Sequence, residues 1–340
     1  MAASAHSAEP SEPGFVGRSV LRLEDPPLLT GAGRFVGDLS FPHQLHMRAV
    51  RSAYAHGRIV AIDTAAAMAA PGVVAVWTSR DTAELPPIAL REGLGTGQAD
   101  LSRLTPYLQP VLARDRVRYV GEPVAAVFAE DPYLAEDAAD LVDVRVEELP
   151  VLLAAIDPPG ELAPGHTTEA DIIRKGYGDL EAAFAKAYAI IELDLAVGRH
   201  SGSPLETRGA LARYDRAADV VELYGAAKIP HVTRDLLART LGRSHGSVHL
   251  HEGHVGGGFG IRGELYPEDV LISLAALRLG RPVKWIEDRR EHLMAANHSR
   301  EQRHHIRVAI DRDGHILAID DIFFHDQGAY LRTHGPAWWI

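Results

Sequence analysis

The 340-residue chain contains no cysteine. Disulfide bonds, thiolate zinc sites, cysteine nucleophiles and iron–sulfur clusters are therefore excluded for this chain, because each of them needs a thiol or a thiolate. We expect any redox centre to be a cofactor held by other groups, or to lie on another subunit. Nothing in the sequence calls for an oxidising compartment, so the cytoplasm is the expected location.

Long apolar runs and clustered positive charge are also missing. No stretch approaches the roughly 20 uninterrupted apolar residues of a membrane-spanning helix, and we expect no membrane association. The formal net charge is −11 at pH 7, whereas neutralising phosphates requires clustered Lys and Arg. We therefore expect small-molecule or protein partners and no nucleic acid.

Chain length and composition predict two domains, because 340 residues exceed what one hydrophobic core usually supports. Residues 1–27 begin with an Ala-, Ser-, Glu- and Pro-rich stretch and are expected to form a flexible tail. We predict one domain at 28–156 and a second at 169–340. The Pro- and Gly-rich residues 157–168 are predicted to be the linker between them.

Apolar periodicity and turn residues predict a mixture of strands and helices, and so an α+β fold. In the first domain the expected elements are strands at 45–50, 73–77, 124–129 and 142–146 and a helix at 132–141, capped by Asp131. In the second domain they are strands at 190–197, 210–213, 220–224, 248–255, 283–287, 305–310 and 316–321 and helices at 180–188, 230–242 and 268–279.

The strongest local signal is the run Gly256, Gly257, Gly258, Phe259 and Gly260, between an expected strand and an expected helix. Glycine allows positive φ and close approach of the backbone to another group, and a run of exposed N–H groups can bind an anionic or oxo group. The spacing fits neither a phosphate-binding P-loop nor a dinucleotide fingerprint. For an isolated cluster, a glycine-rich turn without chemistry is the better interpretation.

The cluster is not isolated. Residues 253–260, GHVGGGFG, resemble the glycine–phenylalanine loop of molybdenum-hydroxylase large subunits, the family of xanthine dehydrogenase, aldehyde oxidase and aerobic carbon monoxide dehydrogenase. Other segments resemble that family in the same order along the chain: 31–38, 51–59, 117–127, 147–150, 203–210, 227–231 and 326–331. The resemblance implies an aldehyde oxidase-type hammerhead domain followed by the first molybdopterin-binding domain, truncated.

The resemblance also implies a reaction and its cofactors. The reaction is oxidative hydroxylation of an aldehyde, an N-heterocycle or a similar small molecule, with water as the oxygen source. Molybdenum is held by a pterin dithiolene, expected in the cytosine dinucleotide form, so a chain without cysteine can bind it. FAD and [2Fe–2S] clusters are expected on partners, a FAD-binding medium subunit and an iron–sulfur small subunit. Gly257, Gly258, Phe259 and Gly260 would face the cofactor, with Phe259 against the substrate.

Two departures from the family pattern concern the substrate and the cofactor. Lys228 stands where members commonly carry a Gln whose amide approaches the molybdenum oxo group. An ammonium can donate to the same oxygen as a point charge, but a solvated lysine at a helix entry is an equal alternative. Xanthine-oxidising members carry a substrate-binding Glu at the position of Gly263. Here the Glu follows as Glu264, which we expect in the substrate pocket.

A third departure concerns catalysis. In the family the general base is a Glu in a Gly-x-Gly-Glu segment of the second molybdopterin-binding domain, which we expect to lie beyond this sequence. We therefore predict no catalytic residue and no metal ligand in this chain, and an oxidoreductase that is inactive without a partner chain carrying the second domain. The alternatives are a non-catalytic split or truncated fragment with a scaffold role, and an unrelated nucleotide-binding protein.

We interpret the remaining charged residues as structural and not as catalytic or binding residues. Residues 287–291, Glu-Asp-Arg-Arg-Glu, are predicted to form a solvated loop with local ion pairs of little energetic value. Glu206 and Arg208 are predicted to form a buried pair that braces the segment around them.

His304 and His305, with His292 and His298 nearby, are a weak metal signal, because adjacent residues on a strand point to opposite faces. We expect these histidines to be solvent-facing or hydrogen-bonded. Trp338 and Trp339 would form an exposed apolar end, which suggests contact with a missing partner.

Overall fold

The computed structural model describes residues 14–90 and 102–332, in two units, 1–34 and 35–340. The first unit carries the short helix α1 (Asp25–Leu29). Residues 1–13 of the expected tail and both terminal tryptophans lie outside the described residues. Everything below concerns the second unit. Within the described ranges, no helix is long and apolar enough to cross a membrane.

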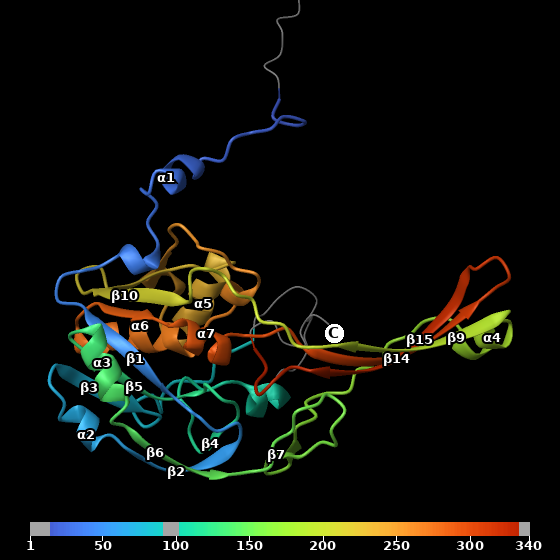
Figure 1. The fold of residues 1–340 in the computed structure, drawn as a ribbon, viewed down its shortest axis with the longest axis horizontal. Coiled ribbons are helices and arrows are strands. Elements are labelled where there is room, and N and C mark those ends of the chain that lie inside the picture. Colours follow the sequence, from blue (N-terminus) through green and yellow to red (C-terminus); the bar gives the residue numbers. More distant parts are fainter. Residues whose placement is uncertain (1–13, 91–101, 333–340) are drawn as a thin grey trace, which may run out of the picture. The chain divides into compact units, whose positions relative to one another are not determined.

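A seven-stranded mixed sheet forms the centre of this unit and combines strands from both expected domains (Figure 1). Its order is β12 (Val248–His251), β11 (Val220–Gly225), β10 (Gly209–Asp215), β13 (Val283–Ile286), β1 (Leu45–Arg51), β5 (Pro123–Ala129) and β3 (Val73–Thr78). β1 runs parallel to β13, with Leu45 opposite Val283. The main hydrophobic cluster is continuous across this junction.

Helices cover both faces of the sheet. α6 (Pro267–Leu279) packs on β10, β11 and β13, and α5 (Pro230–Thr240) packs on β12. α2 (Ala65–Met68) packs on β3, and α3 (Pro132–Ala139) packs on β1 and β5. β5 is buried on both sides, because Phe128 points into the cluster with α6 and Val127 into the cluster with α2 and α3.

Helix ends follow the sequence signals. The Asp131 side chain accepts hydrogen bonds from the amides of Tyr133 and Leu134, which confirms the predicted cap of α3. α6 ends at Gly280, which adopts φ 64° and supplies the left-handed conformation that closes a helix without steric cost. The expected strand at 248–255 is shorter than predicted, because β12 ends at His251.

Two small sheets lie beside the central one. The first has the order β4 (Arg116–Val117), β2 (Gly57–Asp63) and β6 (Asp143–Glu148). The second is the pair β7 (Glu161–Ala163) and β8 (His166–Thr167), which gives the predicted linker a short hairpin. The short 3-10 helices are η1 (Val36–Asp38), η2 (Ser102–Tyr107), η3 (His245–Ser247) and η4 (Ile261–Gly263).

A further sheet of three long antiparallel strands extends away from the body (Figure 1). Its order is β15 (Ile316–Asp326), β14 (Glu301–Ile310) and β9 (Ala189–Val197), and α4 (Leu180–Ala185) packs against β15. The hairpin β14–β15 confirms the expected strand pair at 305–310 and 316–321, with both strands longer at the end nearer the body. The remaining helix, α7 (Arg289–Ala295), follows β13.

Candidate functional site

The glycine loop joins β12 to η4 and lies at the surface. Gly257 adopts φ 105° and Gly260 φ 93°, conformations that glycine reaches without strain. Phe259 adopts φ 49°, which is uncommon for a residue with a side chain. This backbone path leaves the Phe259 ring 79% exposed. The loop therefore presents one aromatic ring to a ligand between positions that favour glycine.

The loop's backbone amides are available for binding. Within residues 14–90 and 102–332, no hydrogen-bond acceptor lies against the amides of Gly257, Gly258, Phe259 and Gly260. A side chain at Gly258 or Gly260 would also meet open space. A row of unpaired N–H groups on a surface without side chains can approach an anionic or oxo group closely.

Glu206 and Arg262 hold the base of this loop. The Glu206 Oε2 atom accepts hydrogen bonds from the Gly256 amide at 2.8 Å and from Arg262 Nη2 at 2.9 Å. The buried Arg262 guanidinium also donates through Nε to the Gly257 carbonyl at 2.9 Å. Charge-assisted hydrogen bonds of this kind are stronger than neutral ones, so the base is fixed while the tip stays open.

The predicted Glu206–Arg208 pair is therefore wrong, since Glu206 binds Arg262 and Arg208 has other partners. Arg262 was not predicted as a site residue from the sequence. The only sequence signal for Arg262 is its position just after the glycine loop. That position alone does not predict that its guanidinium turns back to bind the loop.

Lys228 lies next to the same segment. Its amide donates to the Arg262 carbonyl at 2.7 Å, and its side chain is exposed. The structure thus brings Lys228 and the end of the glycine loop together through the backbone, although they are far apart in the sequence.

Glu264 is buried, unlike the exposed tip of the glycine loop. Its carboxylate is buried and lies 3.9 Å from Arg332 Nε. It lines a small cavity with Gly225, Thr233 and Asp269, and the lining of this cavity includes none of the residues 257–260.

The region 287–291, predicted as a solvated ion-paired loop, is exposed at 288–290 but buries its two glutamates, Glu287 and Glu291. Glu287 is buried, and its carboxylate binds Arg208 at 2.6 Å and His292 Nδ1 at 2.5 Å. The Nε2 atom of His292 lies 2.9 Å from the Gly202 carbonyl oxygen. The prediction of a hydrogen-bonded histidine is confirmed for His292. The prediction of a solvated loop is wrong for Glu287 and Glu291, which are buried against ionic partners from distant segments, and holds for the exposed residues 288–290.

Arg51 extends this network to β1. It binds Glu268 of α6 and Glu291 of α7, each at 2.8 Å, and all three side chains are buried. Burial alone raises the pKa of Glu268, but Arg51 and Arg208 outweigh it and hold that pKa below its usual range. Burial lowers the pKa of Arg208, and its carboxylate neighbours reverse the effect and raise it. The network thus keeps its ionic form while it ties β1 to α6 and α7.

A second buried acid, Glu122, lies in the segment 117–127. Its Oε1 atom accepts a hydrogen bond from the Tyr330 hydroxyl at 2.5 Å, and Oε2 accepts one from the Arg118 amide at 2.6 Å. Burial nevertheless raises the pKa of Glu122 to about 7. Burial likewise raises the pKa of Asp269 to about 6. Both carboxyls favour the protonated form more than an exposed acid does.

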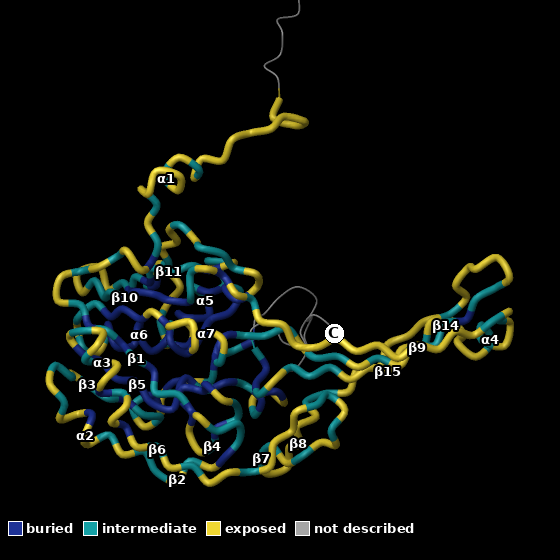
Figure 2. Tube along the Cα trace, in the orientation of Figure 1, coloured by how far each residue is buried: buried dark blue, intermediate teal, exposed yellow. Residues whose placement is uncertain are grey.

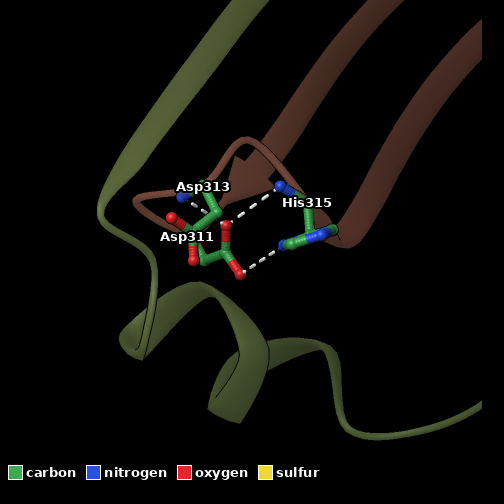
Figure 3. A group of neighbouring side chains, drawn as sticks. All are labelled: Asp311, Asp313 and His315. Atoms are coloured by element: carbon green, nitrogen blue, oxygen red, sulfur yellow. Dashed lines mark hydrogen bonds and ion pairs between the residues drawn. The ribbon is translucent and has the colours of Figure 1, made fainter.

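Asp311, Asp313 and His315 gather at the turn between β14 and β15 (Figure 3). The Asp311 carboxylate accepts hydrogen bonds from the amides of Asp313 and His315, each at 2.9 Å, and lies 3.0 Å from His315 Nδ1. An aspartate that accepts from following amides is a common way of closing a turn. The turn itself accounts for this arrangement.

Two family descriptions match the sequence. Residues 30–150 match the a/b hammerhead domain of aldehyde oxidase and xanthine dehydrogenase. Residues 163–339, more than half of the chain, match the molybdopterin cofactor-binding domain, and this range contains the glycine loop.

Individual proteins agree with these matches. The chain is 44% identical over 331 residues to the 6-hydroxypseudooxynicotine dehydrogenase complex subunit gamma of Paenarthrobacter nicotinovorans, covering 96% of this chain and 41% of that protein. It is 39% identical to the nicotine 6-hydroxylase large subunit of the same organism, covering 93% and 38%. Among solved structures, quinoline 2-oxidoreductase from Pseudomonas putida 86 superposes with a TM-score of 0.85 at 36% identity, covering 95% and 41%.

The chain spans about two-fifths of the length of these relatives. Three findings point to the same family. The two domain matches follow one another along the chain, and the fold is shared with a solved member. The loop with unpaired amides lies inside the cofactor-binding match. The chain therefore belongs to the molybdenum hydroxylases of the aldehyde oxidase and xanthine dehydrogenase family, with a hammerhead domain and a molybdopterin cofactor-binding domain of the large subunit.

Proposed function

We propose that this chain forms part of the large subunit of a molybdenum hydroxylase that oxidises a small N-heterocycle. The observation that carries the proposal is the loop at 257–260, where four amides without a described partner surround one exposed aromatic ring. The relatives named for nicotine and quinoline support an aromatic nitrogen ring as the substrate. A flat ring of that kind packs well on the face of Phe259.

The residues of the loop fit the molybdenum–pterin group. The amides of Gly257, Gly258 and Gly260 would donate to its oxygen atoms, and the open space at Gly258 and Gly260 lets the group approach the backbone. When bound, the group supplies two-electron oxidation of the substrate with water as the oxygen source. The exposed Lys228 ammonium would donate to an oxygen of the cofactor or the substrate.

Several finer assignments belong to the same proposal. The cofactor is in the cytosine dinucleotide form, and the second molybdopterin-binding domain supplies the general base. FAD and [2Fe–2S] clusters lie on a medium and a small subunit, which is supported by the absence of cysteine from this chain. The assembly works in the cytoplasm and binds neither nucleic acid nor membrane. Glu264, whose carboxylate lies 3.9 Å from Arg332 Nε, is assigned to the substrate pocket by its position next to the family's substrate-binding Glu.

The test is reconstitution. The chain is co-expressed with a polypeptide that supplies the rest of the large subunit, and with the medium and small subunits. Molybdenum is measured by mass spectrometry, pterin by its fluorescence after oxidation, and activity by dye-coupled oxidation of nicotine and quinoline. We expect bound molybdenum and activity. A complex without molybdenum would contradict the proposal and favour a scaffold role.

Two matched variants locate the substrate. Phe259→Ala should raise KM for the heterocycle about fivefold, because a ring contact contributes on the order of 1 kcal/mol, while molybdenum content stays the same. Tyr133→Ala removes an aromatic ring that is 75% exposed on α3 and serves as the control, without effect on KM. An unchanged KM for Phe259→Ala would remove this residue from the pocket.

A further inference from the structure

Two histidines of β12 lie on the same face of the central sheet. Residues two apart on a strand point to the same side, so His249 and His251 share one face. Val248 and Leu250 point to the other side, into the main hydrophobic cluster. Both histidines are exposed, β12 is the last strand in the order of the sheet, and its neighbours β11 and β10 lie at the margin of the body (Figure 2). An ion in solution can therefore reach both imidazoles.

The neighbouring strand β11 places a carboxylate beside these histidines. Glu222 lies opposite His249 in the register of the two strands, so its side chain is on the same face. The Oε1 atom of Glu222 is 3.6 Å from His251 Nε2. Two ligand atoms on one tetrahedral zinc ion are about 3.3 Å apart, because each bond is about 2.0 Å long. His251 and Glu222 thus already lie at nearly the separation of two metal ligands.

Other side chains hold this carboxylate and this ring in position. The second oxygen of Glu222, Oε2, accepts a hydrogen bond from Arg213 Nε at 2.5 Å, which leaves Oε1 for His251. The His251 ring stacks on Tyr224, with ring centroids 4.5 Å apart and planes at 14°. Tyr224 in turn packs against Phe41, with ring centroids 5.4 Å apart. Supporting contacts of this kind orient metal ligands before an ion binds.

His249 supplies a third ligand after a small movement. Its ring centroid is 6.4 Å from that of His251. Two imidazoles on one tetrahedral ion have ring centroids about 5 Å apart, so the distance has to shorten by only about 1 Å. His249 is exposed, and within residues 14–90 and 102–332 no hydrogen bond or ion pair holds its ring. Rotation of this side chain therefore costs little.

We propose that His249, His251 and Glu222 form a binding site for a zinc ion. Two imidazoles and one carboxylate are a ligand set that zinc favours, and water takes the fourth position of the tetrahedron. Magnesium and calcium prefer sites made of oxygen atoms alone. The ion joins β11 to β12, the strand that leads into the glycine loop. The sequence predicts no metal ligand in this chain, and zinc binding at this site corrects that prediction.

The test uses the untagged chain and zinc alone, because a histidine tag would itself bind zinc. Isothermal titration calorimetry measures the affinity and the number of sites. Thermal unfolding with and without zinc measures stabilisation, since an ion that binds only the folded state raises Tm. We expect zinc to bind and to raise Tm, and magnesium to do neither. The test needs no molybdenum, so its outcome is independent of the proposed function.

Three alanine variants locate the ion. His249→Ala and His251→Ala should each weaken zinc binding at least about tenfold, since losing even a supporting contact costs that much. Both residues are exposed, so their Tm in EDTA should change little. His315→Ala is the matched control. It removes an exposed histidine that also lies beside an aspartate, in the turn between β14 and β15, and should leave zinc affinity unchanged.

A measurement on the wild type keeps the test independent of how the variants fold. Zinc should shift the imidazole NMR signals of His249 and His251 and leave those of His315 in place. Three results would overturn the proposal. The first is no zinc binding by the wild type, and the second is zinc binding that either His249→Ala or His251→Ala leaves unchanged. The third is zinc binding that is lost in His315→Ala, because this would assign the ion to the turn.

Discussion

Glu206 and Arg262 meet through a single oxygen atom that also holds the glycine loop. Oε2 of Glu206 lies 2.9 Å from Arg262 Nη2 and 2.8 Å from the Gly256 amide nitrogen. Glu206 belongs to the segment 203–210, and Arg262 follows the loop, so two segments recognised separately in the sequence converge here. Both side chains position the loop from behind, away from the amides at 257–260.

Glu206→Gln tests this arrangement. The amide keeps the size of the side chain but loses the charge that strengthens both hydrogen bonds, so we expect a loss of about 1–2 kcal/mol in the free energy of unfolding. Hydrogen exchange of the Gly256 amide should become about tenfold faster. Glu192→Gln, in an exposed ion pair with Arg307, is the control and should change stability little. Unchanged exchange at Gly256 would contradict the role given to Glu206.

Two glycines of the loop should respond differently to alanine. A Cβ at Gly256 would lie 2.4 Å from the Glu206 Cβ, so Gly256→Ala forces the loop and its support apart, at a cost of about 1–3 kcal/mol. A Cβ at Gly258 meets nothing within 4 Å, and Gly258→Ala should stay within about 0.5 kcal/mol of the wild type. Denaturant unfolding measures both. Equal costs at the two positions would show that the loop is packed differently.

The buried ionic network predicts a large effect at Arg208. Arg208 pairs with both Glu287 and Glu268. Arg208→Leu leaves these two buried carboxylates without that partner, so we expect the free energy of unfolding to fall by about 3–5 kcal/mol. The double variant Arg208→Leu/Glu287→Leu should recover part of that loss. Arg58→Leu breaks an exposed pair with Glu147 and should cost less than about 1 kcal/mol. A small effect at Arg208 would mean that the network is open to solvent.

Glu122 should make stability fall as pH rises. Its pKa is about 7 in the fold and near 4.5 when unfolded, so the folded state holds its proton more tightly. The stabilising contribution is complete below pH 4.5 and is lost as pH rises to about 7, amounting to at most about 3 kcal/mol.

Glu122→Gln imitates the protonated carboxyl and should flatten that slope, as measured by unfolding at several pH values. Asp269, with a pKa raised to about 6, contributes a slope of the same sign at lower pH and remains in the variant. An unaltered slope between pH 4.5 and 7 in Glu122→Gln would assign the pH dependence to another group.

Local signals in the sequence determined most elements and the position of the candidate loop. The Asp131 cap, the Gly280 stop of α6 and the glycine run all act on backbone within a few residues, so they can be recognised without knowing the fold. β2 and α7 were among the elements not predicted, although Asp288 and Glu291 form a capping box at the start of α7.

Only the tertiary structure decided which charges meet and which of them are buried. Arg208 and Glu287 are 79 positions apart, and Arg51 and Glu291 are 240 apart. The sequence around 287–291 therefore gives no sign that these two glutamates are buried with ionic partners. The pairing of β1 with β13 likewise joins the two expected domains in one sheet. Ionic partners and burial depend on the path of the whole chain, because they are set by distance in space and not by distance in sequence.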